Sequence, residues 1–206
     1  MKKFVSLFFV IILLLFLSGC GGHTPPKNAN NICGIFREMD DWYDAANDSY
    51  KKWGVPPYVS LAIMHQESRF EAAARPPRKK FLWIFPGARP SSAFGYAQAL
   101  DGTWEKYKTS TGNSWADRDD FEDAIDFIGW YCDQSRRISG ISKHDAYNQY
   151  LAYHEGQGGY NRGTYRKKKW LRQVAQKVQN RANLYKRQFR ECKKEFENKG
   201  WSFWPF

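Results

Sequence analysis

Glu67 has the sequence context of a catalytic acid. It lies in the segment HQESRF (residues 65–70), directly after an apolar stretch, residues 61–64, that predicts a helix ending near Ser68. Burial disfavours the charged form of a carboxyl group, and so does the negative end of a helix dipole. Both effects raise a glutamate pKa toward the range that a general acid needs near neutral pH. The alternative is an ordinary surface glutamate at the end of a helix.

Two later segments carry polar and aromatic residues beside predicted helices. Residues 93–98 read AFGYAQ, and residues 151–156 read LAYHEG. Together with the glutamate segment they resemble, in order, the three motifs of the soluble lytic transglycosylase family, whose fold is that of goose-type lysozyme. The resemblance covers about residues 55–189. The matching positions are Glu67, Ser68 and Phe70 in the first motif, Gly95 and Gln98 in the second, and Ala152, Tyr153 and Gly156 in the third.

The resemblance implies a role for each of these positions. Glu67 would be the catalytic acid and base, and Tyr153 would form hydrogen bonds near it, although Tyr153 also fits a core aromatic residue. Ser68 would either orient the glutamate or cap the chain. The residues expected to bind substrate are Ser68, Gly95, Tyr96, Gln98, His154 and Glu155.

The sequence departs from the family pattern at several positions. Tyr96 and Ala97 replace leucine and methionine, and His154 stands where the family has asparagine. The stretch between Glu67 and Gly95 is also longer than is usual in the family. The departure at His154 puts the substrate contact of its family counterpart in doubt.

Most glycosidases use two carboxyl groups, but the three motifs offer only Glu67. The resemblance therefore implies that Glu67 protonates the oxygen between N-acetylmuramic acid and N-acetylglucosamine. Glu67 then accepts a proton from the muramoyl 6-hydroxyl, which closes on its own anomeric carbon and leaves a 1,6-anhydromuramoyl end. Entropy favours such an internal nucleophile over a captured water. The alternatives are a peptidoglycan hydrolase of the muramidase type and a non-catalytic glycan-binding lipoprotein.

The elements that must position these residues are predicted to be helices, because apolar residues recur at spacings of three and four and no window alternates as a strand would. We expect an all-α, lysozyme-like domain over residues 32–199, followed by a tail over 200–206. Helices are predicted over 35–53, 57–68, from an N-cap at Asp101, from Asp119 or Asp120, from a capping box at 142–145, and over 171–189. A Gly-rich loop is expected after residue 156.

The stretch from residue 75 to 92 interrupts this helical pattern. Its prolines argue against a helix. Its apolar cluster, residues 81–85, is either tucked into the core or part of a binding wall.

The N-terminus has the pattern of a bacterial lipoprotein. Lys2 and Lys3 precede an apolar run, and Leu-Ser-Gly comes before Cys20, as in a lipobox. We expect a signal peptide over residues 1–19, lipid on Cys20 and a flexible tether over 20–31, with the protein held at the outer membrane and facing the periplasm. An uncleaved or ordinarily cleaved signal is the alternative.

The net charge of +11 arises at the C-terminal end, because residues 162–199 contain 14 Lys and Arg and 3 Glu. This basic helix is either a solvated face or a surface that attracts an anionic polymer. A secreted chain rarely meets nucleic acid, so we expect no nucleic-acid partner. The resemblance implies peptidoglycan glycan strands as the partner, and we expect a monomer as the working form.

Three cysteines remain beyond Cys20, and a secreted protein permits a disulfide. We expect Cys33 to pair with Cys192, because these two bracket the motifs, and Cys132 to be left over. No cysteine or histidine spacing predicts a metal site, and the expected reaction needs no cofactor.

Overall fold

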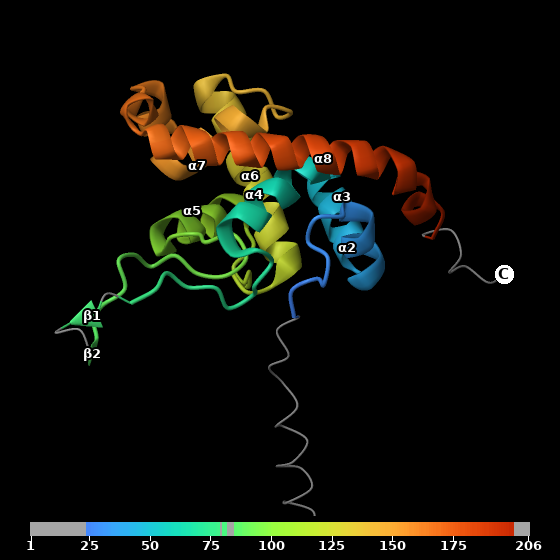
Figure 1. The fold of residues 1–206 in the computed structure, drawn as a ribbon, viewed down its shortest axis with the longest axis horizontal. Helices are drawn as coiled ribbons and strands as arrows, with labels where there is room; N and C mark the ends of the chain where they lie inside the picture. The colour runs from blue at the N-terminus through green and yellow to red at the C-terminus, as the bar shows by residue number, and fades with distance from the viewer. Residues whose placement is uncertain (1–23, 79, 82–84, 200–206) are drawn as a thin grey trace, which may run out of the picture.

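The computed structural model describes residues 24–78, 80–81 and 85–199, and its fold is all-α, as expected (Figure 1). Two short strands, β1 (Lys80–Phe81) and β2 (Phe85–Pro86), pair antiparallel. None of the described helices is both long and apolar enough to cross a membrane. The helical elements are α2 (Ile32–Glu38), α3 (Trp42–Trp53), α4 (Pro57–Ser68), α5 (Asp101–Thr111), α6 (Phe121–Ser139), α7 (Ala146–Asn161), the short 3-10 helix η1 (Thr164–Lys167) and α8 (Lys169–Lys199).

Helix α4 forms the centre of the domain. Every residue from Val59 to Met64 is buried, so the helix has no solvent face over this stretch. It packs against α3, α6, α7 and α8. A helix that is buried all round is held firmly by its neighbours. The residues at its C-terminal end, including Glu67, are therefore fixed relative to the rest of the domain.

Helix α8 lies across α4 and α7 along one side of the molecule (Figure 1). Its 31 residues correspond to a length of about 46 Å. One apolar stripe faces the core, at the spacing of three and four that predicts a helix, and the rest of the surface is largely basic. The stripe consists of Leu171, Ala175, Val178, Ala182, Tyr185 and Phe189.

The first predicted helix is in fact two helices. Residues 35–53 were expected to form one element, but α2 ends at Glu38 and α3 begins at Trp42. The C-cap of α2, Met39, has an extended backbone. Ile35, Met39, Trp42 and Ala46 are all buried. The apolar stripes of the two helices face the same core in nearly continuous phase, and this is why the periodicity hid the break.

Two predicted helix caps also need correction. Asp101 is the first residue of α5 and makes no capping hydrogen bond; its carboxylate pairs with Arg118 at 2.7 Å. The predicted capping box at 142–145 is wrong, because Asp145 is itself the N-cap of α7 and accepts a hydrogen bond from the Asn148 amide at 3.0 Å. The alternative of Asp120 as the start of α6 is confirmed by its bond from the Asp123 amide.

The Gly-rich stretch after residue 156 is helical rather than a loop. Helix α7 continues to Asn161 and is interrupted at one residue, Gly156, whose φ of 71° and ψ of 155° are not helical. Such a conformation favours glycine because other residues are strained there. The consequence is a kink directly after the third motif.

The proline-rich segment carries β1 and β2 at its tip and projects from the helical body (Figure 1). The apolar side chains at 81–85, for which core and binding-wall positions were both considered, lie outside the side chains that the structure describes.

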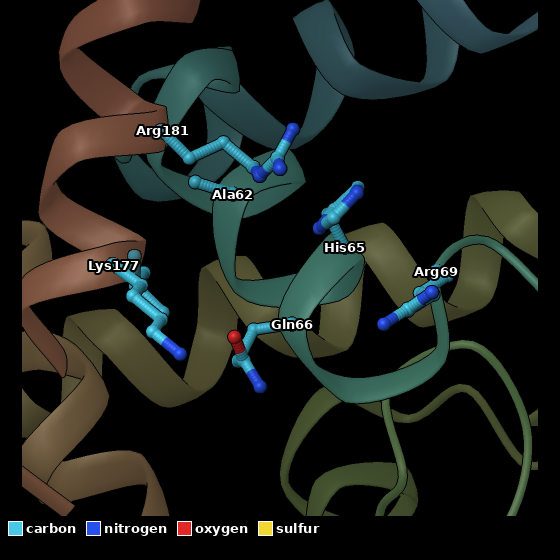
Figure 2. Close-up of a pocket in the computed structure, with 7 residues that line it drawn as sticks. Ala62, His65, Gln66, Arg69, Lys177 and Arg181 are labelled. Carbon is cyan, nitrogen blue, oxygen red and sulfur yellow. The ribbon is translucent and has the colours of Figure 1, made fainter. Parts of the chain in front are cut away.

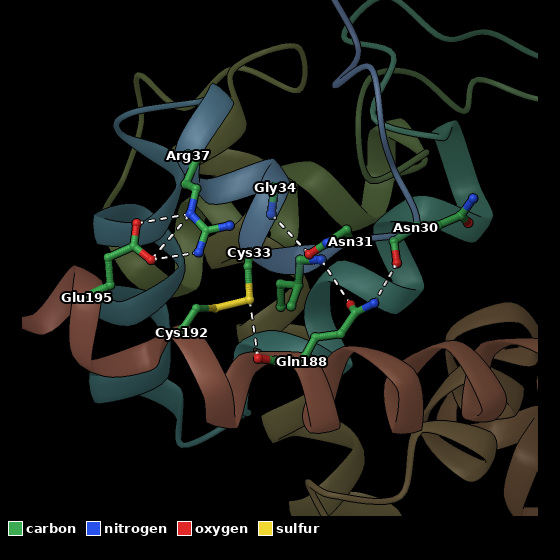
Figure 3. Close-up of a disulfide and its surroundings, with 9 residues drawn as sticks. Asn30, Asn31, Cys33, Gly34, Arg37, Gln188, Cys192 and Glu195 are labelled. Carbon is green, nitrogen blue, oxygen red and sulfur yellow. Dashed lines mark hydrogen bonds and ion pairs between the residues drawn. A yellow bond between two sulfur atoms is a disulfide. The ribbon is translucent and has the colours of Figure 1, made fainter.

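A disulfide ties the two ends of the domain together (Figure 3). Cys33 of α2 is bonded to Cys192 of α8, which confirms the expected pairing, and Cys132 is buried with a free thiol. Arg37 supports the same junction, because its guanidinium donates to the Glu195 carboxylate, with Nη2 to Oε2 at 2.7 Å.

Part of the segment 20–31, which was expected to be a flexible tether, contacts the helical domain. The Lys27 amide donates to the Glu38 carboxylate at 3.1 Å, and the Tyr185 hydroxyl donates to the Ala29 carbonyl. Gln188 Nε2 donates to the Asn30 carbonyl at 3.1 Å (Figure 3). The chain is therefore fastened to α2 and α8 from about Lys27 onward. The signal peptide, Cys20 and the tail over 200–206 lie outside the described residues.

Candidate active site

Glu67 lies in the last turn of the buried helix α4, with its side chain partly exposed. Protein surrounds the carboxyl group closely, and this burial raises its pKa from 4.5 to about 7. A hydrogen bond with Tyr150 acts in the opposite direction by stabilising the carboxylate. The net result is an acid that is about half protonated near neutral pH, which is the state that general acid catalysis needs.

The chain turns sharply just after the glutamate. Arg69 and Phe70 both have positive φ values, 55° and 67°, which are uncommon for residues other than glycine. Phe70 is fully buried against Trp42, with ring centroids 5.6 Å apart, and this packing stabilises the turn. Strained backbone of this kind is concentrated at functional sites.

Ser68 stabilises the same turn. Its hydroxyl donates to the Met64 carbonyl at 3.3 Å and accepts from the Phe70 amide at 3.1 Å. Because Ser68 is buried and both bonds go to the backbone, the geometry favours a cap for the chain over the expected contact with substrate.

Gly95 brings the second motif against the chain that follows the first. Its amide donates to the Ala74 carbonyl at 3.0 Å. Its φ is 79°, and a Cβ atom at this position would lie 1.9 Å from the Arg118 carbonyl oxygen. Any larger residue would therefore push the second motif away from the backbone at Arg118. Gly95 therefore has a structural role, and its expected contact with substrate stays a prediction.

Tyr96 is a core residue, which corrects its expected assignment to substrate binding. It is 1 % exposed, and its ring packs edge-on against Trp42 and Phe121 at centroid distances of 5.7 and 5.8 Å. Its larger side chain, in place of the family's leucine, fills the core behind the motif.

Gln98 holds the second motif in shape. Its amide nitrogen donates to the Ala74 carbonyl at 2.8 Å and to the Gly95 carbonyl at 2.9 Å. Its φ of 49° is also in the left-handed region. Gln98 remains partly exposed beside the glutamate segment, so a substrate contact through its amide oxygen stays a prediction.

The third motif contributes two tyrosines from α7. Tyr153 donates from its hydroxyl to the Ala97 carbonyl at 2.6 Å, which joins the third motif to the second. The hydrogen bond to Glu67 comes instead from Tyr150, one helical turn earlier. The charge of Glu67 contributes to raising the pKa of both tyrosines, although burial is the larger cause for each. Both hydroxyls therefore lie near the carboxyl group.

Tyr150 is the functional residue that the sequence reasoning missed. The signal was its position three residues before Tyr153, since residues three apart share a helix face.

Glu155 has a structural role, and its expected contact with substrate stays a prediction. Its carboxylate accepts hydrogen bonds from Lys168 Nζ at 2.7 Å, from the Thr164 hydroxyl and from His154 Nδ1 at 3.0 Å. Burial opposes ionisation, but these bonds outweigh it and lower the Glu155 pKa to about 2. These bonds join α7 to η1 and the start of α8. His154 itself is exposed and packs its ring edge against Trp170.

These contacts unite the three motifs around a single carboxyl group. The sequence matches the model of the family described as "Transglycosylase SLT domain" over residues 8–192. The chain belongs to this family. No curated protein matches the chain. Membership confirms the resemblance and the lysozyme-like, all-α fold, and it supports a function of the lytic transglycosylase type that acts on peptidoglycan.

The site of this transglycosylase SLT domain has one carboxylic acid at its centre. Within the described residues, the influences on the Glu67 pKa are burial and Tyr150, and no second carboxylate contributes. No group of three or more His, Cys, Asp or Glu in the same part of the chain could hold a metal ion. The candidate site thus contains one protonatable carboxyl group with two tyrosine hydroxyls near it.

Proposed function

We propose that the protein is a lytic transglycosylase that cleaves the β-1,4 bond between N-acetylmuramic acid and N-acetylglucosamine and forms 1,6-anhydromuramoyl ends. The observation that carries this proposal is Glu67, a single carboxyl group with a pKa of about 7 and no second carboxylate acting on it among the described residues. Two-carboxylate mechanisms need a second acid within about 5–9.5 Å.

In the proposed mechanism, protonated Glu67 donates its proton to the bridging oxygen as the glycosidic bond breaks. The electron pair of that bond stays with the departing N-acetylglucosamine, and positive charge develops at the muramoyl anomeric carbon. The Glu67 carboxylate then accepts the proton of the 6-hydroxyl, whose oxygen bonds to that carbon. Glu67 ends protonated, ready for another cycle. Tyr150 stabilises the intermediate carboxylate through its hydrogen bond.

The rival from the same fold is a hydrolase, in which water replaces the 6-hydroxyl. A hydrolase that inverts needs a base for the water, and one that retains needs a nucleophile. Among the described residues, no carboxylate contributes to the Glu67 pKa, which favours the one-carboxylate route. A non-catalytic glycan-binding protein would not require a carboxyl group with a pKa near 7, so the same observation favours an enzyme.

Substitution of Glu67→Gln tests the catalytic role. It retains the shape of the side chain and removes the acid, so we expect release of fragments from purified peptidoglycan to fall at least about 100-fold. Glu71→Gln is the matched control, because Glu71 is exposed four residues further on. Wild-type turnover by the Glu67 variant would refute the proposal.

We also propose that the mature chain begins at a lipidated Cys20 and acts as a monomer from the outer membrane into the periplasm. The support is the lipobox-like sequence, and Cys20 lies outside the described residues. Cys20→Ala should move the protein from the membrane fraction to the soluble fraction. Intact mass showing no acyl chains on the wild-type protein would contradict this.

A further inference from the structure

A cavity of about 350 Å³ lies between α4 and α8 (Figure 2). One face of α4 contributes Ala62, His65 and Gln66, and the C-cap Arg69 continues this face. Lys177 and Arg181 line the cavity from α8, which crosses α4 here. The volume falls within the range of about 300–1,000 Å³ that is usual for organic ligands, and it exceeds the size of one inorganic anion.

The cavity is electropositive. Arg69, Lys177 and Arg181 each carry a positive charge, and the described lining contains no acidic residue. None of these three cations forms an ion pair with a carboxylate in the part of the chain that the structure describes. Three uncompensated cations at one cavity repel one another, and an anion between them would relieve that repulsion.

The pKa of His65 is lowered partly by the same positive charges. Burial lowers its pKa to about 4, and Arg181 and Arg69 contribute to the lowering. The imidazole is therefore neutral near neutral pH and offers one donor and one acceptor to a polar ligand. Gln66 adds an amide group that suits a peptide or acylamino substituent.

Arg181 is held in place before any ligand binds. Its Nη1 donates to Asn30 Oδ1 at 2.9 Å and to the Ala29 carbonyl at 3.3 Å. These bonds use one guanidinium nitrogen and leave other N–H groups for a ligand. A fixed side chain loses little conformational entropy on binding, which favours affinity.

The cavity and the Glu67 side chain lie on different sides of the same turn of α4. Gln66 lines the cavity and Glu67 is the next residue, so their side chains leave α4 about 100° apart. The two side chains are therefore separated by no more than the diameter of a helix, about 10 Å. A peptide of three residues spans that distance, at about 3.3–3.6 Å per residue. A ligand in the cavity could thus be part of a substrate held at Glu67.

We propose that this cavity binds a free carboxylate of the peptide stem attached to the glycan, and so selects stem-bearing strands. The inference rests on the proposed function, since that function brings a muramoyl residue to Glu67. Arginine binds carboxylates with paired hydrogen bonds, and the size of the cavity favours a peptide over a lone anion. Arg69, Lys177 and Arg181 would bind the carboxylate while Gln66 meets the peptide backbone.

Direct binding to a short peptide tests the inference without glycan cleavage. The probe is L-alanyl-γ-D-glutamyl-L-lysine with free carboxylates, and the same peptide with its carboxylates amidated is the control. Calorimetry on the mature wild-type chain should show binding of the free acid and at least about 10-fold weaker binding of the amide. NMR titration should show that the bound acid raises the His65 pKa, because a nearby negative charge favours the imidazolium.

Matched double variants assign the binding to the cavity. Arg69→Asn with Lys177→Gln removes two cavity charges, and asparagine tolerates the left-handed backbone of residue 69. Arg187→Gln with Lys194→Gln removes the same charge from exposed positions on α8 that do not line the cavity. The first pair should weaken peptide binding at least about 10-fold, and the second should not. Lys177→Gln alone should weaken binding severalfold and guards against misfolding of the double variant.

Three outcomes would overturn the inference. They are equal binding of acid and amide, equal weakening by both double variants, or inorganic phosphate that binds as tightly as the peptide acid. The last result would mean a general anion site. Failure of the cavity assignment is distinguishable from failure of the proposed function, because the first is measured by peptide binding and the second by the glycan products that the protein releases. A chain that releases anhydro products but ignores the peptide refutes only the cavity assignment, and a chain that binds the peptide but releases none refutes only the enzyme.

Discussion

Glu67→Gln should stabilise the protein at neutral and alkaline pH while it removes activity. In the folded chain the Glu67 pKa is about 7, whereas its ordinary value is 4.5. The folded state therefore retains a proton that the unfolded state loses between these two pH values. Stability from this group is fully present below 4.5, decreases as pH rises toward 7 and stays lower above it. One pH unit corresponds to about 1.4 kcal/mol. The free energy of unfolding of the wild-type protein should therefore fall by about 3 kcal/mol, relative to that of the glutamine variant, as the pH rises from 4.5 to above 7.

Urea unfolding of both proteins at pH 4, 6 and 8.5, with the disulfide intact, measures this difference. All other titrating groups are common to the two proteins, so the change with pH in the difference isolates Glu67. A fixed offset could arise from amide packing, but only the ionisation of Glu67 produces a difference that grows between pH 4.5 and 7. A difference that stays constant over this range would refute the assignment of a buried acid with a raised pKa.

Three other perturbations follow from the contacts described above. Tyr150→Phe removes the hydrogen bond that lowers the Glu67 pKa, so the alkaline limb of the rate profile for peptidoglycan turnover should move to higher pH; an unchanged or lower limb would contradict this. Replacement of Cys33 and Cys192 by serine should reduce the free energy of unfolding by up to about 5 kcal/mol in the chain-entropy model, and an unchanged value by urea unfolding would show that the bridge is not needed. Lys167→Gln with Lys169→Gln should weaken sedimentation with intact sacculi at low salt and have little effect at high salt, whereas equal binding at every salt concentration would mean a merely solvated face.

Lys168 is left out of the last test for a structural reason. Its ion pair with Glu155, at 2.7 Å, holds η1 and the start of α8 against α7. Substitution there would disturb the fold together with the surface charge. Lys167 and Lys169 are exposed, so their substitution changes charge alone.

The helices could be predicted where one apolar face repeats without interruption. The buried stripe of α8 and the apolar stretch of α4 are examples. The apolar stretch of α4 was enough to predict from the sequence that Glu67 lies at the end of a helix. Met39 shows where apolar periodicity fails as a guide. The apolar stripe of α2 continues into α3, but the backbone at Met39 between them is extended, because the two helices pack on the core separately. Gly158 and Gly159 show another limit, because they lie in helix α7 beyond the kink at Gly156, where a loop was expected.

The candidate site could be predicted at the level of motifs but not at the level of side-chain roles. Motif matching assigned Tyr96 and Glu155 to substrate, yet Tyr96 is packed in the core and Glu155 is bound by Lys168. The position of Tyr96 depends on Trp42 and Phe121, which are distant in sequence, and the carboxylate of Glu155 is already bound by Lys168. Tyr150 lies outside the matched motif, and only the packing of α7 against α4 reveals its hydrogen bond with Glu67.

Mass spectrometry of the soluble fragments that the mature protein releases from purified sacculi tests the central claim most directly. If Glu67 works alone and the muramoyl 6-hydroxyl is the nucleophile, the wild-type protein should release fragments with 1,6-anhydromuramoyl ends, each one water lighter than the hydrolytic product. The Glu67→Gln variant should release almost none, and Glu71→Gln should match the wild type. Fragments with reducing muramoyl ends, or anhydro fragments from the Glu67→Gln variant, would contradict the account.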